Sequence, residues 1–259
     1  MSDLIAAFNK YFEVVPANTT ELKNQFFHLR YQVYSQELQL PGFESWHYPD
    51  GREIDKYDKR SVYSLLRHRQ SKSIVGGLRL VLCDPDDPFQ PFPIEEHVGH
   101  YFDTRLVDST QLPRRTTAEI SRLVVARDFR CRGKEVLYAH GMDYSSFDDK
   151  SDNRRQFPHP VLGLLVALVQ MSSQYGITHW YAIMEPVLNR LLRRFSFDLK
   201  PIGPAVDYYG IRQPYLNTID NVLTRVFQKN QDIWDLVTDH GRIWPAPRQW
   251  AVKQLSTNS

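Results

Sequence analysis

Apolar residues at helical spacing mark the first long element of the chain. Asn18 lies three residues before Glu21, a spacing typical of a capping box, so we expect a helix to begin there. The helix is expected to end near "LPGF", residues 40–43. One of its faces carries four apolar residues: Leu22, Phe26, Leu29 and Val33. The polar segment 52–60 that follows predicts a loop.

Runs rich in β-branched and aromatic residues indicate the strands. "SVYSLLR" (61–67) and "SIVGGLRLVL" (73–82) flank a short polar turn and predict a β-hairpin. A further strand is predicted from about Thr117 to Ala126, and "THWYAIM" (178–184) predicts a buried one. "DLKPIGPAVDYYGIRQPYL" (198–216) predicts the last two strands, which would flank a Gly-Pro turn.

Helical patterns fill most of the remaining chain. The sequence becomes helical from Gly133, and an apolar helix is predicted from Pro160 to Gly176, a favourable residue just after a helix end. Pro186 begins a short amphipathic helix, and a helical tail is predicted over residues 216–240.

Residues 84–115 form a long connection that contains Pro85, Pro88, Pro91 and Pro93 and is too long for an ordinary turn. Inside a compact domain such a loop is commonly a lid or a substrate wall; a plain surface loop is the alternative.

The order of these elements predicts a mixed α/β layer. A helix is followed by a hairpin, a central strand, a glycine turn, a helix, a strand, a helix and the final strands. No internal repeat, low-complexity tract or linker divides the chain. We therefore expect one domain over residues 1–259, with a Pro-rich insertion at 84–115 and a helical tail from about 216.

Composition narrows the class of function. Apolar residues make up 42% of the chain and charged residues 24%, which is ordinary for a globular protein. The net charge of +2 disfavours a nucleic-acid binder. Local arginine clusters suit a phosphate or an acidic partner protein, or are simply solvated faces. They are Arg114/Arg115, Arg127/Arg130/Arg132, Arg154/Arg155 and Arg190/Arg193/Arg194.

Cysteine and histidine usage disfavours disulfides and metal sites. The chain has two cysteines, Cys83 and Cys131, and nine histidines that form no recognisable ligand pattern. The N-terminal segment lacks the apolar region of a signal peptide, and the apolar run 161–171 is shorter than the roughly 20 residues of a membrane span. We expect a cytoplasmic protein with no integral membrane segment and no metal.

The segment "AEISRLVVARDFRCRGK" (118–134) places polar residues inside a predicted buried strand. Strand alternation puts Glu119 and Ser121 on one face, and Ile120 and Arg122 on the other unless a bulge intervenes. Glu119 is therefore the better candidate for direct chemistry, because burial raises the pKa of a carboxyl toward values useful for a general base.

Four short motifs in a fixed order carry a family resemblance. "FFHLRYQVY" contains Arg30, "IDKYDK" contains Asp55 and Asp58, "GGLRL" contains Arg79, and "EISR" contains Glu119 and Arg122. The order of the predicted elements resembles the GNAT acyltransferase fold, a mixed central sheet with splayed strands flanked by helices. Within that fold, the four motifs in this order resemble the acyl-homoserine-lactone synthases. "AEISRLVV" and residues 184–215 are similar to N-acyl amino acid synthases of bacterial exosortase (PEP-CTERM) systems. The resemblance covers roughly residues 10–215.

The resemblance implies three groups of site residues. The catalytic group is Glu119, Ser121, Asp55 and Asp58. An acceptor-binding or electrostatic group is Arg30, Arg79 and Arg122, of which Arg79 or Arg122 would hold an amino-acid carboxylate; purely structural pairing of these arginines with the acids is the alternative. The group that would hold the pantetheine arm and phosphate of the donor is Leu123, Val124, Val125, Arg130, Arg132, Gly133 and Lys134.

The implied reaction moves a fatty acyl group from a thioester to the α-amine of an amino acid, with no tightly bound cofactor. Glu135 stands where related phosphate loops end in glycine or alanine, which favours acyl carrier protein over acyl-CoA as the donor. Arg127, Arg130, Arg132 and Lys134 would meet that acidic partner. Two alternatives remain: homoserine-lactone synthesis from S-adenosylmethionine, and a non-catalytic module that binds an acyl chain or its carrier.

Overall fold

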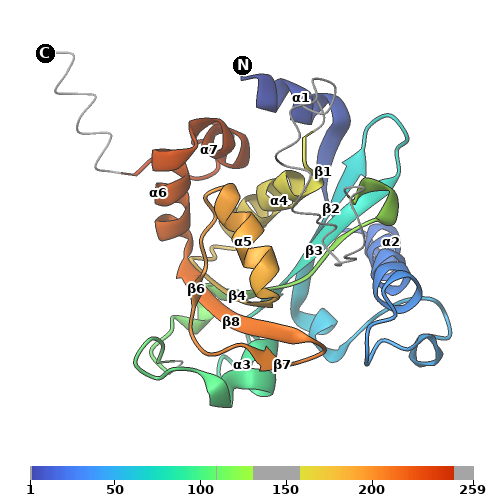
Figure 1. Cartoon of the computed structure of the whole chain (residues 1–259), viewed down its shortest axis with the longest axis vertical. Coiled ribbons are helices and arrows are strands. Elements are labelled where there is room, and N and C mark those ends of the chain that lie inside the picture. Colours follow the sequence, from blue (N-terminus) through green and yellow to red (C-terminus); the bar gives the residue numbers. More distant parts are fainter. Residues whose placement is uncertain (1, 109, 131–157, 248–259) are drawn as a thin grey trace, which may run out of the picture.

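The computed structural model describes residues 2–108, 110–130 and 158–247 of the chain (Figure 1). The described residues form one sheet in the order β1-β2-β3-β4-β5-β8-β6, and β7 pairs with β8 beside this path. Only β4 and β5 run parallel; the other described neighbours are antiparallel. The strands are β1 (Phe12–Pro16), β2 (Ser61–His68), β3 (Ile74–Leu82), β4 (Thr117–Val125), β5 (His179–Met184), β6 (Lys200–Pro201), β7 (Val206–Asp207) and β8 (Ile211–Thr218).

Helices cover both faces of the sheet (Figure 1). On one face α1, α4, α5, α6 and α7 contribute to the largest apolar core, and on the other α2 and α3 pack in two smaller clusters. The helices are α1 (Asp3–Tyr11), α2 (Thr20–Tyr31), α3 (Pro93–Val98), α4 (Pro160–Gln174), α5 (Pro186–Arg194), α6 (Ile219–Lys229) and α7 (Gln231–Thr238). A π-helix (Gln32–Glu37) continues α2, and 3-10 turns span Ser45–His47, Lys56–Arg60, Gly99–Tyr101, Arg114–Thr116 and Arg127–Phe129.

Close contact of α2 with the sheet explains a glycine in β3. A Cβ atom on Gly77 would lie 2.6 Å from Cε2 of Phe26, so a larger residue would push the helix away. Phe26 is fully buried in this contact. The close approach holds the C-terminal half of α2, which carries Arg30, against the strand that carries Arg79.

The predicted hairpin, the two central strands and the helices from Pro160 and Pro186 are confirmed. The apolar helix ends at Gln174, two residues before Gly176, whose positive φ of 64° suits glycine. A helical tail is present as α6 and α7. The helix predicted from Gly133 lies outside the described residues.

Three details differ from the sequence predictions. The first long helix is capped by Thr19 rather than Asn18, because the Thr19 hydroxyl accepts the Leu22 amide at 3.2 Å. The final region contains three strands instead of two, and the turn between β7 and β8 passes through Gly210. Segment 84–115 contains α3, which begins at Pro93. The N-terminal elements α1 and β1 were not predicted.

A β-bulge in β4 changes which face Arg122 occupies. Arg79 pairs with Ser121 and Gly77 pairs with Val124, so two residues of β4 oppose one residue of β3. Arg122 adopts a positive φ of 52° at this point. The simple alternation that separated Arg122 from Ser121 is therefore wrong, because the bulge turns both side chains toward the face covered by α2 and α3.

The parallel strands β4 and β5 separate beyond the middle of the sheet. Their last pair is Ile120 with Ala182, although β4 continues to Val125 and β5 continues to Met184. The backbone of β4 beyond Ile120 therefore has no pairing with β5. Within the described residues, no helix is long and apolar enough to cross a membrane.

Candidate active site

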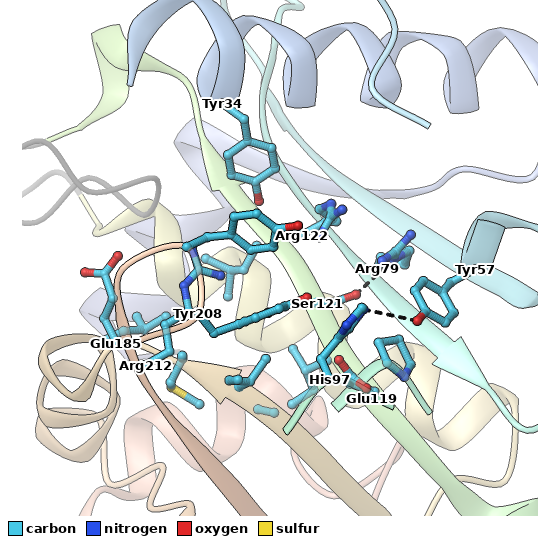
Figure 2. A pocket seen from close by; sticks show the side chains of 18 of the residues that line it. Tyr34, Tyr57, Arg79, His97, Glu119, Ser121, Arg122, Glu185, Tyr208 and Arg212 are labelled. Carbon is cyan, nitrogen blue, oxygen red and sulfur yellow. Dashed lines mark hydrogen bonds between the residues drawn. The ribbon is translucent and has the colours of Figure 1, made fainter. Parts of the chain in front are cut away.

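A cavity of about 350 Å³ lies where β4 and β5 separate, and it reaches both faces of the sheet. Its polar part lies on the face of α2 and α3 (Figure 2). Its apolar part lies between the sheet, α4 and α5. The polar lining includes Glu53, Asp55, Lys56, Arg79, His97, Glu119, Ser121, Arg122, Glu185, Tyr208 and Arg212. The apolar lining includes Leu165, Leu168, Trp180, Ala182, Met184, Leu188, Leu192, Phe197 and Leu199.

Arg30 lies beneath the cavity, fully buried near the C-terminal end of α2. Its Nε contacts a carboxylate oxygen of Glu53, and its two terminal nitrogens contact the two oxygens of Asp58 at 2.8 and 3.1 Å. This bidentate contact leaves no open face for a ligand. Arg30 therefore orders the loop between α2 and β2.

Arg79 and Arg122 complete the same network. Arg79 contacts Asp55 at 2.6 Å and Asp58 at 2.8 Å through its Nη1. Arg122 contacts Glu53 at 3.0 and 3.1 Å and Asp55 at 2.9 Å. Three arginines thus meet three carboxylates, and the charges of the network cancel.

Local geometry explains the spacing of the two aspartates. Asp55 caps the 3-10 turn Lys56–Arg60 by accepting the Tyr57 amide at 2.9 Å, and Asp58 returns the contact by accepting the Asp55 amide at 2.8 Å. This capping box holds both carboxylates toward the arginines.

Glu53 is the member of the network that sequence reasoning missed. It is only 1% exposed, although it lies in a segment predicted as a polar loop. Burial by itself raises the pKa of Glu53, but the charges of Arg122 and Arg30 outweigh burial and lower it to about 2. Burial also raises the pKa of Asp58, but the charges of Arg30 and Arg79 outweigh burial and lower it. Both carboxylates are therefore ionised and serve as counter-ions. Glu53 lies just two residues before Asp55, and that proximity was its only sequence signal.

Glu119 lies beside this network without an arginine partner of its own. It is 1% exposed, and its Oε2 accepts the backbone N–H of Ile94 at 2.7 Å. Burial raises the pKa of Glu119 to about 8, and neither the Ile94 amide nor the charges of Arg79 and Arg122 cancel that effect. A carboxyl with such a pKa can take up a proton near neutral pH.

Ser121 lies two residues after Glu119, on the same face of β4. Its Oγ accepts a hydrogen bond from Nε of Arg79 at 2.9 Å (Figure 2). Since the oxygen lone pair is engaged by Arg79, the hydroxyl proton is available to a ligand in the cavity.

The Pro-rich segment 84–115 supplies one wall of the cavity. Its helix α3 provides Pro93 and His97 to the lining, and the Ile94 amide to Glu119. Glu96 anchors α3 to the turn Lys56–Arg60 through Lys56 and through the Tyr57 hydroxyl, which donates at 2.8 Å. This part of the segment therefore forms a wall of the cavity.

Of the residues predicted to bind the donor, some line the cavity and others are buried away from it. Leu123 lines the cavity, whereas Val124 and Val125 are buried in the cores on opposite faces of the sheet. Arg130 is 6% exposed and is held by Glu37 and by the carbonyl of Val125. Its guanidinium therefore secures the end of β4. Arg132, Gly133 and Lys134 lie outside the described residues.

The described residues contain no group of three histidine, cysteine, aspartate or glutamate side chains arranged to hold a metal ion. The chemical resources of the site are therefore a raised-pKa carboxyl, a serine hydroxyl, unpaired strand backbone and an apolar compartment.

Comparisons with known proteins agree with this architecture. BjaI, a CoA-dependent acyl-homoserine lactone synthase solved with MTA, has a TM-score of 0.57 and 22% identity, over 95% of this chain and 99% of BjaI. TofI, solved with an inhibitor and MTA, has a TM-score of 0.55 and 18% identity, over 87% of this chain and 96% of TofI. FeeM, an N-acyl amino acid synthase from uncultured soil microbes, has a TM-score of 0.51 and 7% identity, over 84% of this chain and 96% of FeeM.

At these identities the three structures share the fold. No curated protein is significantly similar to the chain in sequence. Residues 29–152 match the acetyltransferase (GNAT) domain. Residues 29–152 are therefore similar to the acetyltransferase (GNAT) domain, and the chain shares its fold with BjaI, an acyl-homoserine lactone synthase.

Proposed function

We propose that the protein transfers a fatty acyl group from a thioester to the α-amine of an amino acid, giving an N-acyl amino acid and a free thiol. The observation that carries this proposal is the cavity at the separation of β4 and β5. It joins a buried carboxyl with a pKa of about 8 to an apolar compartment behind the sheet. An amine acceptor needs the carboxyl to take its proton, and a fatty chain needs the apolar compartment.

The apolar part of the cavity fits an acyl chain. Trp180, Ala182 and Met184 point from β5 toward the core of α4 and α5. Leu188 and Leu192 of α5 complete the wall. A chain placed there leaves water, which supplies binding energy of about 25 cal/mol per Å² of apolar surface buried. Its thioester would then lie at the separation of the strands, beside Ser121.

Glu119 takes the proton of the acceptor amine, directly or through one water. The amine nitrogen attacks the thioester carbonyl, a C–N bond forms, the C–S bond breaks, and the sulfur leaves as a thiol. The unpaired backbone of β4 supports the developing oxyanion, a contribution that can reach several kcal/mol in other enzymes. The Ser121 hydroxyl gives its proton to the leaving sulfur and takes in exchange the second proton of the attacking amine, so the thiol forms and the serine stays neutral. Asp55, Asp58, Arg30, Arg79 and Arg122 hold this arrangement in place.

We assign the donor to acyl carrier protein before acyl-CoA, because Glu135 would oppose a pyrophosphate. Since Arg130 is held by Glu37, this assignment rests on Arg127, Arg132 and Lys134 as contacts for the acidic carrier. The reaction takes place in the cytoplasm, within a single catalytic domain, and belongs to the exosortase-associated type that the sequence motifs resemble.

Homoserine-lactone synthesis is the second candidate, because the TM-scores to BjaI and TofI exceed the TM-score to FeeM. That reaction needs S-adenosylmethionine as the acceptor and an additional lactonisation. It releases methylthioadenosine, which an amino-acid acceptor does not. A non-catalytic acyl-binding module has no use for a carboxyl with a raised pKa.

Mass spectrometry of lipid extracts tests the proposal. Cells that overproduce the protein are expected to accumulate N-acyl amino acids that are missing from cells producing the Glu119→Gln variant at the same level. Accumulation of an acyl-homoserine lactone would select the second candidate. Folded protein that releases no thiol from acyl carrier protein or acyl-CoA with any of the common amino acids would contradict both.

A further inference from the structure

The basic groups that line the cavity differ in whether the protein itself neutralises them. Lys56 contacts Glu96, Arg79 contacts Asp55 and Asp58, and Arg122 contacts Glu53 and Asp55. These cations are therefore already committed to carboxylates of the chain. Arg212 is the exception. Among the described residues, no carboxylate lies within 4.0 Å of its guanidinium, and its buried Nε has no hydrogen-bond partner.

The register of the sheet places Arg212 on the face that carries Glu119. Glu119 pairs with Tyr181, and Tyr181 pairs with Leu216, so these three side chains form one row across β4, β5 and β8. Arg212 lies four residues before Leu216 in β8 and therefore on the same face. In Figure 2, Arg212 lies on the opposite side of the cavity from Tyr57, with Tyr208 and Ser121 between them.

Arg212 lines the cavity together with Tyr208 and Glu185, and its charge acts on both of them. Burial raises the pKa of Tyr208 to about 12, while the charges of Arg122 and Arg212 oppose that rise. Burial also raises the pKa of Glu185, against the opposing charge of Arg212. Glu185 and Arg212 lie on the same side of the cavity in Figure 2. A guanidinium N–H buried without an acceptor is costly, so a ligand that supplies an acceptor is favoured there.

We propose that Arg212 binds the carboxylate of the acceptor and thereby restricts the acceptor to α-amino acids. This inference rests on the function proposed above. A guanidinium matches a carboxylate in geometry and charge, and no carboxylate of the described chain uses this one. With the carboxylate at Arg212, the amine points back toward Glu119 and the thioester. Arg79 and Arg122, the sequence candidates for this role, are occupied by Glu53, Asp55 and Asp58.

The test compares each amino acid with the amine that lacks its carboxylate. Phenylalanine is paired with phenethylamine, tyrosine with tyramine, and leucine with isopentylamine, with decanoyl-CoA and decanoyl-acyl carrier protein as donors. Thiol release gives kcat and KM for the wild-type protein, Arg212→Gln and Arg212→Lys. Arg105→Gln is the matched control, because the Arg105 side chain is 87% exposed and pairs only with Asp103 among the described residues.

Arg212→Gln is expected to raise KM for the preferred amino acid by about ten- to a hundredfold, the effect of losing a charged hydrogen bond. Its KM for the matching amine should stay at the wild-type value. Arg212→Lys should recover part of the loss, because it keeps the charge but not the bidentate geometry. Arg105→Gln should behave like the wild-type protein.

Two results would overturn the inference, and they are distinguishable. If the wild-type protein acylates amino acids and Arg212→Gln lowers kcat/KM equally for amino acid and amine, Arg212 does not read the carboxylate, while the proposed function stands. If the wild-type protein acylates no member of any pair from either donor, the proposed function fails and this inference fails with it.

Discussion

Replacing Glu119 with glutamine should increase stability at alkaline pH while slowing catalysis. Glutamine keeps the size of the side chain and an oxygen that can accept the Ile94 amide. Burial holds the pKa of Glu119 at about 8 instead of 4.5, so the folded protein retains a proton that the unfolded chain has lost. Each pKa unit corresponds to about 1.4 kcal/mol, so ionised Glu119 destabilises the fold by a few kcal/mol.

The sign of the pH dependence follows from this difference. Below pH 4.5 the carboxyl is protonated in both states and has no effect on the free energy of unfolding. Between pH 4.5 and about 8 only the unfolded chain releases the proton, so wild-type stability falls as pH rises. Glutamine does not titrate. The stability of the Glu119→Gln variant relative to the wild type should therefore increase between pH 4.5 and about 8 and stay constant above that range.

Urea denaturation at a series of pH values, followed by circular dichroism, measures this difference directly. Thermal unfolding should give the same order, with the variant several degrees more stable at pH 9. The acyl-transfer rate of the wild-type protein should rise with pH through about 8, and the variant should be slower by about 10²- to 10⁴-fold, the usual contribution of a general base.

A variant that is equally or less stable than the wild type at pH 9 would refute the assignment of a raised pKa. A variant that is more stable but fully active would refute the role of Glu119 as the base. Because stability and activity are expected to move in opposite directions, loss of folding cannot imitate the predicted result.

The charge network and the acyl compartment give three further predictions. Glu53→Gln should destabilise the fold by about 3–5 kcal/mol in urea denaturation, because it removes one of the two carboxylates that Arg30 and Arg122 each contact and leaves an excess positive charge in the buried network. Asp50→Asn, at an exposed pair, should leave the denaturation curve unchanged. Because the pKa of Glu53 is about 2, its stabilising contribution to the free energy of unfolding should be complete above about pH 4.5 and be lost as pH falls through 2. Unfolding measured between pH 2 and 6 would reveal this loss, and a free energy of unfolding that does not change with pH would contradict it. Leu188→Trp should shift the product mixture toward shorter acyl chains in a competition assay, and an unchanged chain-length distribution would place the chain elsewhere.

Local patterns predicted the elements that frame the site. Continuous apolar runs marked β5 and α4, and the proline-initiated pattern marked α5, because these elements are buried over most of their length. The nine-residue α1 and the five-residue β1 are short, and they pack against β2, α4 and α7. Such contacts between distant segments leave no periodic signal in the sequence.

Most residues of the site could be predicted from the sequence, but the contacts between them could not. The order of the motifs brought Arg30, Asp58 and Glu119 to attention, yet the partner of Arg122 lies 69 residues away in a polar loop. The position of the β4 bulge depends on the pairing of β3, so alternation alone assigned Arg122 to the wrong face. Arg212 lies in a final strand among buried and half-buried residues, and only the order of β4, β5 and β8 brings it to the cavity.

Simultaneous measurement of thiol release and amide formation tests the central claim most directly. Purified protein is mixed with decanoyl-acyl carrier protein and the common amino acids at pH 8, and both products are quantified over time. The account predicts one N-decanoyl amino acid for each thiol released by the wild-type protein, and formation of both products about 10²- to 10⁴-fold more slowly by the Glu119→Gln variant. Thiol release without an amide, or equal amide formation by the variant, would contradict the account.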